Sequence, residues 1–438
     1  MTNNMIKFYS AVLLGIAAML FPPPVSVRAD FQWEHKLTDP NSAIGDSFGG
    51  SVSISKNLCV VGAPADDYNG VDSGSAYIFR FDGFNWVPEA RLLALDGSAG
   101  DLFGVSVSLD GELCLIGASG DEDNGDNTGS AYIFRFQDPN WIQEAKLTAF
   151  DGVQNDEFGT SVSVSGNRCV IGASGDDDNG DGSGSGYVFR FDGENWLCEH
   201  KLLASDGRAG DLFGCSVSIS GDLCLTGAKF DDDNGDKSGS AYIFRYEDPN
   251  WVEQAKLTPS DGTAGDFFSS SVSLDGNLCL IGAHGDDDRG EHTGSAYVFR
   301  YSEPNWVQEA KLAASDGGAW DFFGRSVALS GDLCLVGAYM DSSFASEAGS
   351  AYLFRFADGF WQETASLSAA DRVHHDHFGW SVSLDSGNVL VGAIRKDDYT
   401  GAAYSFRPCP SADLTDDCFV DIEDFAVLAD WWLRGEDL

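Results

Sequence analysis

The C-terminal end of the chain carries oxygen-bearing side chains at a spacing that suits a hard cation. They take positions 1, 3, 5, 9 and 12 of a twelve-residue loop: Asp413, Thr415, Asp417, Asp421 and Asp424. The carbonyl of Phe419 stands at position 7, where an EF-hand loop uses a backbone oxygen. This spacing predicts a Ca²⁺ site, followed by a helix over Ile422 to Leu433. An acidic turn before a docking helix is the alternative.

Two further groups of residues could bind metal. Loops at 121–126, 176–181 and 231–236 are rich in Asp and Asn oxygens, so weak Ca²⁺ binding and a solvated acidic turn are both open for them. His374, His375 and His377 flank Asp376 in a single loop. Adjacent side chains of one loop do not easily converge on one transition-metal ion, so we do not predict a site there.

Catalysis usually needs a singular arrangement of residues, and the carboxylates of this chain are periodic instead. One aspartate column recurs seven times: Asp46, Asp101, Asp156, Asp211, Asp266, Asp321 and Asp376. A residue used this often is expected to accept hydrogen bonds from loop N–H groups. No Ser/His/Asp, phosphate-loop or paired Cys-x-x-Cys pattern stands out, and we therefore predict a protein that is not an enzyme.

The elements that position these residues come from a repeat with a period of 55 residues. A Phe, usually followed by Gly, recurs at Phe48, Phe103, Phe158, Phe213, Phe268, Phe323 and Phe378. A Gly-Ala pair recurs from Gly62 to Gly392 at the same interval. In the third copy, strand-length apolar runs cover Ser161 to Ser165, Arg168 to Ala173, Gly186 to Phe191 and Trp196 to Leu202. Four strands repeated radially predict a β-propeller, with a stacked β-solenoid as the main competitor.

The ends of the repeat region indicate how the ring closes. A lone strand, Phe31 to Leu37, precedes the first repeat, and only one strand, Ala402 to Arg407, follows the last Gly-Ala. Pairing these two strands completes a seventh blade and leaves no long unpaired edge. We therefore predict an all-β fold over 30–407, a seven-bladed propeller of four-stranded blades, with a calcium-loop and helix tail at 408–438.

These signatures resemble a known family. Phe48-Gly49 and Gly62-Ala63-Pro64 are similar to FG-GAP repeats, the units of the integrin α-subunit propeller, in the variant found in large secreted bacterial proteins. The family's calcium loop does not carry over, because a short turn such as Ser165-Gly166-Asn167 stands in its place. The tail resembles half of a dockerin, which implies attachment to a cohesin-like partner, although Cys418 replaces the turn glycine and the second loop-helix repeat is missing.

The first 29 residues resemble a secretory signal. Lys7 precedes an apolar run from Ala11 to Phe21, and Val27-Arg28-Ala29 suits a small-residue cleavage site. Pro22 to Pro24 interrupt the run too early for a transmembrane helix, and no other stretch could span a bilayer. We expect a secreted or cell-surface protein, in which Cys409 and Cys418 could form a disulfide.

The net charge of −43 excludes nucleic acid and anionic membranes as partners. The acidic residues follow the second and fourth strands of each repeat, and these connections lie at the same end of an antiparallel blade, so one face should be strongly acidic. Cysteines recur at one position from Cys59 to Cys334 and are expected to be buried hydrophobes, whereas Cys198 and Cys215 have no assignment. A tryptophan column from Trp86 to Trp361 is expected to pack between blades, with sugar platforms as the alternative.

Two function classes remain. One is a non-enzymatic propeller that binds an extracellular protein or glycan, and the other is a polysaccharide-acting enzyme or an accessory subunit of a cohesin/dockerin assembly. A specific site on a ring should appear where the repeat is broken, and on the acidic face the breaks concentrate in blades six and seven. The candidate ligand-binding residues there are Trp320, Phe344, His374, His375, Arg395, Lys396 and Tyr399.

Overall fold

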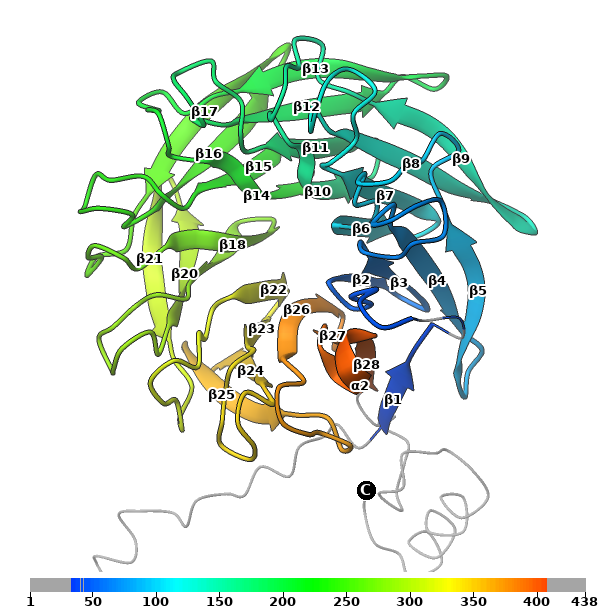
Figure 1. Cartoon of the computed structure of the whole chain (residues 1–438). Coiled ribbons are helices and arrows are strands. Elements are labelled where there is room, and N and C mark those ends of the chain that lie inside the picture. The colour runs from blue at the N-terminus through cyan, green and yellow to red at the C-terminus, as the bar shows by residue number, and fades with distance from the viewer. Residues whose placement is uncertain (1–32, 40, 42, 408–438) are drawn as a thin grey trace, which may run out of the picture.

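The computed structural model describes residues 33–39, 41 and 43–407, and these form a closed ring of seven four-stranded sheets (Figure 1). Blades one to three comprise β2 (Ser51–Ser55), β3 (Leu58–Ala63), β4 (Ser75–Phe81) and β5 (Trp86–Leu92); β6 (Ser106–Asp110), β7 (Leu113–Ala118), β8 (Ser130–Gln137) and β9 (Asn140–Leu147); and β10 (Phe158–Ser165), β11 (Arg168–Ala173), β12 (Ser185–Phe191) and β13 (Trp196–Leu202). Blades four and five comprise β14 (Phe213–Ser220), β15 (Leu223–Ala228), β16 (Ser240–Glu247) and β17 (Asn250–Leu257); and β18 (Phe268–Asp275), β19 (Leu278–Ala283), β20 (Ser295–Ser302) and β21 (Asn305–Leu312). Blades six and seven comprise β22 (Ser326–Ser330), β23 (Leu333–Ala338), β24 (Ser350–Ala357) and β25 (Phe360–Leu367); and β26 (Phe378–Asp385), β27 (Asn388–Ala393), β28 (Ala402–Arg407) and β1 (Trp33–Leu37), with a single helical turn, α2 (Lys396–Tyr399), between β27 and β28.

The predicted propeller is confirmed, including its closure. Strand β1 pairs antiparallel with β28, from Trp33 opposite Arg407 to Leu37 opposite Ala403. The two ends of the described chain therefore share blade seven, and the first strand of each blade lines the central channel (Figure 1). No helix among the described residues is long and apolar enough to cross a membrane.

Neighbouring blades approach so closely that the glycine of each Gly-Ala pair has no room for a side chain. A Cβ atom placed on the glycine of each Gly-Ala pair would lie 1.9–2.5 Å from a backbone carbonyl oxygen of the next blade. The glycine that follows the recurrent Phe has φ between 87° and 93° in six blades, a region that favours glycine. In blade five, Ser269 takes this place at φ 70°, and its hydroxyl donates to the Ser240 carbonyl.

Serine hydroxyls then join each blade to its neighbour. Ser161 Oγ donates to the carbonyl of Gly214 in the next blade at 2.7 Å, and Ser381 closes the ring by donating to Gly49. The apolar core lies between blades, where Phe158 is fully buried and packs edge-on against Tyr187 at 5.3 Å. The six recurrent cysteines are fully buried and unpaired, which confirms that they act as small hydrophobes.

Substituting one inter-blade glycine tests this packing. Gly172→Ala places a Cβ 1.9 Å from the Gly214 carbonyl oxygen, so the blades must separate. We expect the free energy of unfolding to fall by about 3 kcal/mol in a denaturant titration. Gly186→Ala is the matched control, because its Cβ would meet only ordinary contacts at 3.6 Å or more and the equivalent residue of other blades is Ala76 or Ala131. Equal effects of the two substitutions would contradict this interpretation.

Candidate functional site

The loops that follow the second and fourth strands pack against each other on one face of the disc, as the strand order predicts. In blade three, the N–H of Gly210 donates to the Asp181 carbonyl, and the N–H of Leu212 donates to the Gly182 carbonyl. These loops carry most of the aspartates, and we call this side of the ring the acidic face.

The periodic aspartates two residues before the recurrent Phe organise these loops. Each carboxylate accepts a hydrogen bond from the backbone N–H three residues earlier, at 2.6–2.7 Å, in all seven blades. Burial raises the pKa of Asp101, Asp156 and Asp321 to about 6. The expectation that this column bonds to loop N–H groups is confirmed.

A lysine already occupies the centre of the acidic loops that we considered for calcium. Lys256 Nζ lies 2.8, 2.9 and 2.5 Å from carboxylate oxygens of Asp206, Asp231 and Asp233. Tyr242 donates its hydroxyl to Asp206 and Asp231. The same arrangement surrounds three other lysines: Lys146, Lys201 and Lys311. A calcium ion in loops 121–126, 176–181 or 231–236 would therefore have to displace an ammonium group.

Blades six and seven break this arrangement. In blade six, Ser366 takes the position of the lysine. The carboxylates of Asp316 and Asp341 therefore have no ammonium between them, and both accept a hydrogen bond from the hydroxyl of Tyr352. In blade seven, Lys396 replaces the buried aspartate. Its side chain is 3% exposed, and its ammonium donates to Asp376 at 2.9 Å. We predicted that Lys396 would contact a ligand at the surface. In the structure its side chain is buried instead, and its ammonium stabilises the loop by pairing with Asp376.

The other candidate residues fall into three places. His374, His375, Arg395 and Tyr399 line one cavity of about 610 Å³ between blades six and seven, together with Glu347 of blade six. Phe344 is 64% exposed and packs against the guanidinium of Arg372 at 4.0 Å. Trp320 is 47% exposed and contacts His292 at 4.6 Å between ring centroids. The predicted calcium loop and the cysteine pair Cys409 and Cys418 lie outside the described residues.

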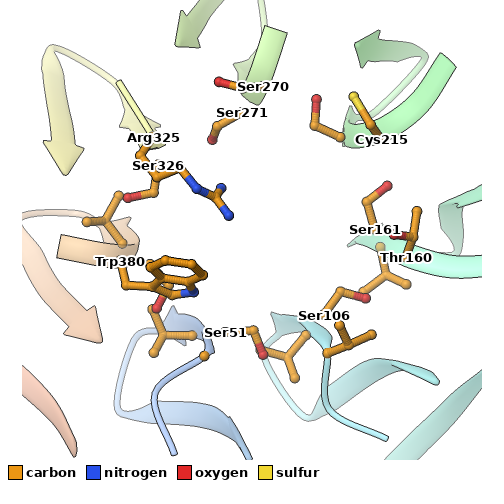
Figure 2. A pocket seen from close by; sticks show the side chains of 18 of the residues that line it. Ser51, Ser106, Thr160, Ser161, Cys215, Ser270, Ser271, Arg325, Ser326 and Trp380 are labelled. Atoms are coloured by element: carbon orange, nitrogen blue, oxygen red, sulfur yellow. The ribbon is translucent and has the colours of Figure 1, made fainter. Parts of the chain in front are cut away.

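The structure adds a second cavity that the sequence interpretation missed. About 520 Å³ of the central channel opens on the acidic face, and Figure 2 shows Arg325 and Trp380 pointing into it. The guanidinium of Arg325 lies 4.7 Å from the centre of the Trp380 ring. Lys229 lines the same cavity, and among its described lining residues there is no Asp or Glu.

Aromatic side chains continue from this cavity around the channel mouth. We call the following set the aromatic arc: Phe230, Phe267, His284, Phe322, Tyr339 and Trp380. Successive ring centroids lie 5.1–5.9 Å apart. The ring of Trp320 contacts the arc at Phe322, with 6.0 Å between the two ring centroids. Burial, with Arg325 and Lys229 nearby, lowers the pKa of His284 to about 3, so this imidazole is neutral at pH 7.

Alignment of the seven repeats could have revealed the aromatic arc, because its residues lie in columns that differ between blades. The position of Phe267 and Phe322 holds Ser47, Leu102, Glu157 and Leu212 in the first four blades. Another divergent column holds Gly50, Val105, Thr160, Cys215, Ser270, Arg325 and Trp380. The first column is aromatic or histidine in blades five to seven, and the second is basic or aromatic only in blades six and seven.

Comparison with protein families decides the identity of the repeats. The FG-GAP repeat model matches seven segments of the chain: 31–79, 86–134, 141–189, 196–244, 251–299, 306–354 and 361–406. The chain belongs to the FG-GAP repeat family. A comparison with curated proteins finds no match. Among solved structures, the crystal structure of Saccharomyces cerevisiae Sqt1 is similar, with a TM-score of 0.45 and 10% identity over 81% of this chain and 82% of that one, a likeness too distant to carry an argument.

The tryptophans of these FG-GAP repeats serve blade packing, as expected. Each indole N–H donates to a side chain of the preceding blade, for example Trp196 to Glu144 at 2.8 Å and Trp251 to Glu199 at 3.1 Å. Trp86 makes the corresponding bond to Ser405 of β28, across the closure of the ring. The six rings are therefore held between blades and do not form a row of free platforms.

Removing one loop lysine tests the electrostatic role of the acidic loops. Lys256→Met leaves the buried carboxylate of Asp231, only 3% exposed, beside Asp206 and Asp233 with no cation of its own, since Arg208 reaches only Asp233. We expect a loss of about 2 kcal/mol in the free energy of unfolding at pH 7, less than for a fully buried pair because Lys256 is partly exposed. Lys56→Met, on an exposed turn, makes the same charge change and should have little effect.

The pH dependence of this loss has a definite sign. Burial raises the pKa of Asp206, but the hydrogen bonds from Lys256 and Tyr242 and the charge of Lys256 together outweigh it, and the folded pKa lies below its usual value. The stabilisation is therefore present above the unfolded pKa of about 4 and disappears as the pH falls through the folded pKa. The difference between Lys256→Met and the unsubstituted protein should shrink below about pH 4, and a difference that grows there would contradict the assignment.

Proposed function

We propose that this FG-GAP propeller is a secreted or cell-surface binding protein without enzymatic activity, and that it recognises an extracellular protein or glycan on its acidic face. The observation that carries the proposal is the asymmetry of the channel mouth. Aromatic and basic side chains gather there in blades four to seven, whereas the equivalent positions of blades one to three hold small or aliphatic residues and Glu157, and those blades close in the same way. Exposed aromatic residues such as Trp320 and Phe344 extend the same region outward.

The use of the carboxylates supports a binding role. The seven periodic aspartates are engaged with loop N–H groups, and the loop aspartates of four blades surround a lysine. Groups committed to these contacts are poorly placed to exchange protons with a substrate. Binding through a surface of aromatic side chains requires no such exchange.

The termini complete the proposal. Residues 1–29 would direct export, and residues 408–438 would bind Ca²⁺ and attach the propeller to a cohesin-like partner. Both segments lie outside the described residues, so this part rests on the ligand spacing of Asp413 to Asp424 and on the resemblance to half of a dockerin.

An array experiment tests the binding role directly. The chain without residues 1–29 is applied to glycan and extracellular-protein arrays, with and without Ca²⁺. We expect selective retention on one class of ligand. Absence of specific binding under both conditions would overturn the proposed function.

The exposed aromatics should contribute to recognition. Trp320→Ala combined with Phe344→Ala should weaken binding of the ligand found on the arrays by about tenfold, which corresponds to about 1.4 kcal/mol. The melting temperature should stay nearly unchanged, because both side chains are exposed. Phe84→Ala is the control, since Phe84 is 65% exposed on a turn of the opposite face. Undiminished binding by the double variant would remove these two residues from the site.

The calcium loop makes a separate prediction. Asp413→Ala with Asp424→Ala removes ligands at positions 1 and 12 of the loop. Calorimetric titration of the full chain with Ca²⁺ should then show one site fewer than the unsubstituted protein. Asp332→Ala, in an exposed turn of the propeller, should leave the stoichiometry unchanged. Equal stoichiometry in all three proteins would contradict the tail site.

A further inference from the structure

The two ends of the central channel differ in charge. The cavity on the acidic face contains Lys229 and Arg325 and no Asp or Glu among its described lining residues. The cavity at the opposite end contains Asp110, Asp275 and Asp385 and no Lys or Arg among its described lining residues. The chain has 69 acidic and 26 basic residues. A cavity whose only charged side chains are positive is therefore a local reversal of the overall charge.

Arg325 is held toward the channel without a partner for its charge. Figure 2 shows its guanidinium extending into the cavity beside the Trp380 ring. Among residues 33–407 that the structure describes, no carboxylate forms an ion pair with it. Some described arginines form ion pairs, as Arg135 does with Glu144 and Arg168 with Glu199, and others such as Arg245 do not. What distinguishes Arg325 is that its unpaired guanidinium lies inside the channel cavity. A guanidinium is a planar fork of donors that matches an oxyanion, and in a partly enclosed cavity such a partner is favourable.

The fold does not require this arginine. The equivalent positions in blades one to five hold Gly50, Val105, Thr160, Cys215 and Ser270, and each of those blades closes in the same way. Lys229 is also singular, because its column holds Pro64, Ser119 and Ser174 in the first three blades. Two separate blades therefore contribute basic side chains to one end of the channel, and an anion would be stabilised at that end.

The surroundings of Arg325 indicate what kind of molecule carries the anion. A smaller cavity of about 290 Å³ adjoins the first and shares Lys229, Ser270 and Arg325 with it. Its other described lining residues are rings of the aromatic arc, Phe230, Phe267 and His284. Aromatic faces beside hydroxyl groups and cations suit a sugar ring, because its C–H faces pack on aromatic carbon while its anionic group reaches the basic residues.

We propose that the channel mouth binds the anionic group of an acidic sugar, with Arg325 and Lys229 as its counter-charges and the aromatic arc against the ring. The proposal rests on the proposed binding function and names its ligand class. Carboxylated and sulfated sugars share the required chemistry. A long polyanion is disfavoured, because at physiological ionic strength the acidic face repels charges within the screening length of about 8 Å. A short oligosaccharide, or a chain end entering the cavity, is expected.

Binding of defined oligosaccharides by the full chain tests the inference. Calorimetry compares a trimer of galacturonic acid, a sulfated disaccharide and a neutral gluco-oligosaccharide. We expect at least one acidic sugar to bind and the neutral one not to bind at that site. Arg325→Met should weaken acidic-sugar binding at least tenfold, and Lys229→Met should weaken it less. Arg325→Lys should restore part of the affinity, because it keeps the charge but loses the two-pronged geometry.

The controls separate this inference from the proposed function. Arg245→Met makes the same charge change outside both channel cavities and should leave the affinity unchanged. Circular dichroism and the melting temperature establish that each variant is folded. If the arrays find only neutral glycans or proteins, including acidic peptides, or if Arg325→Met binds acidic sugars normally, the inference is overturned while the binding function stands. If nothing binds, both fail.

Discussion

The fold depends on how closely one blade can approach the next. Where the Gly-Ala glycine of one blade faces a backbone carbonyl of its neighbour, there is no room for a single carbon atom. This approach brings the serine hydroxyls of the first strands within hydrogen-bonding distance of the neighbouring backbone and encloses the Phe and Tyr rings between sheets. The glycines and the phenylalanine of the repeat thus have one physical role, which is to set the spacing between blades. Seven repetitions of that spacing close the ring.

Much of this was predictable because a structural requirement repeats whenever the blade repeats. The strand order, the pairing of β1 with β28, the buried cysteines and the hydrogen bonds of the Asp156 column all follow from positions shared by the seven copies. The channel mouth was not predicted from the same pattern, because its residues come from several columns and several repeats, and each looks like an isolated divergence in its own column. Only the curvature of the ring brings Phe267, Phe322 and Trp380 into one arc.

Lys396 shows a second limit of the sequence. A lysine in a column of aspartates indicates a reversal of charge, and an exposed recognition residue is a natural interpretation. In the structure the positive charge of Lys396 is instead compensated locally, because its ammonium donates hydrogen bonds to the Asp376 carboxylate and the Asp371 carbonyl. Alignment of repeats identifies an exceptional position, but the charges of the neighbouring loops determine whether that position faces solvent or its own blade. Arg325 differs because no described carboxylate compensates it.

The sharing of blade seven by both ends of the described chain has a mechanical consequence. Strand β28 is bordered by β27 on one side and β1 on the other. A pull applied along the chain at Arg407 therefore acts in shear on two rows of backbone hydrogen bonds at once, and these rows must fail together. A strand at the edge of the sheet would be held by only one such row. Any load that reaches the ring through residue 407 is thus borne by an internal strand of its last blade.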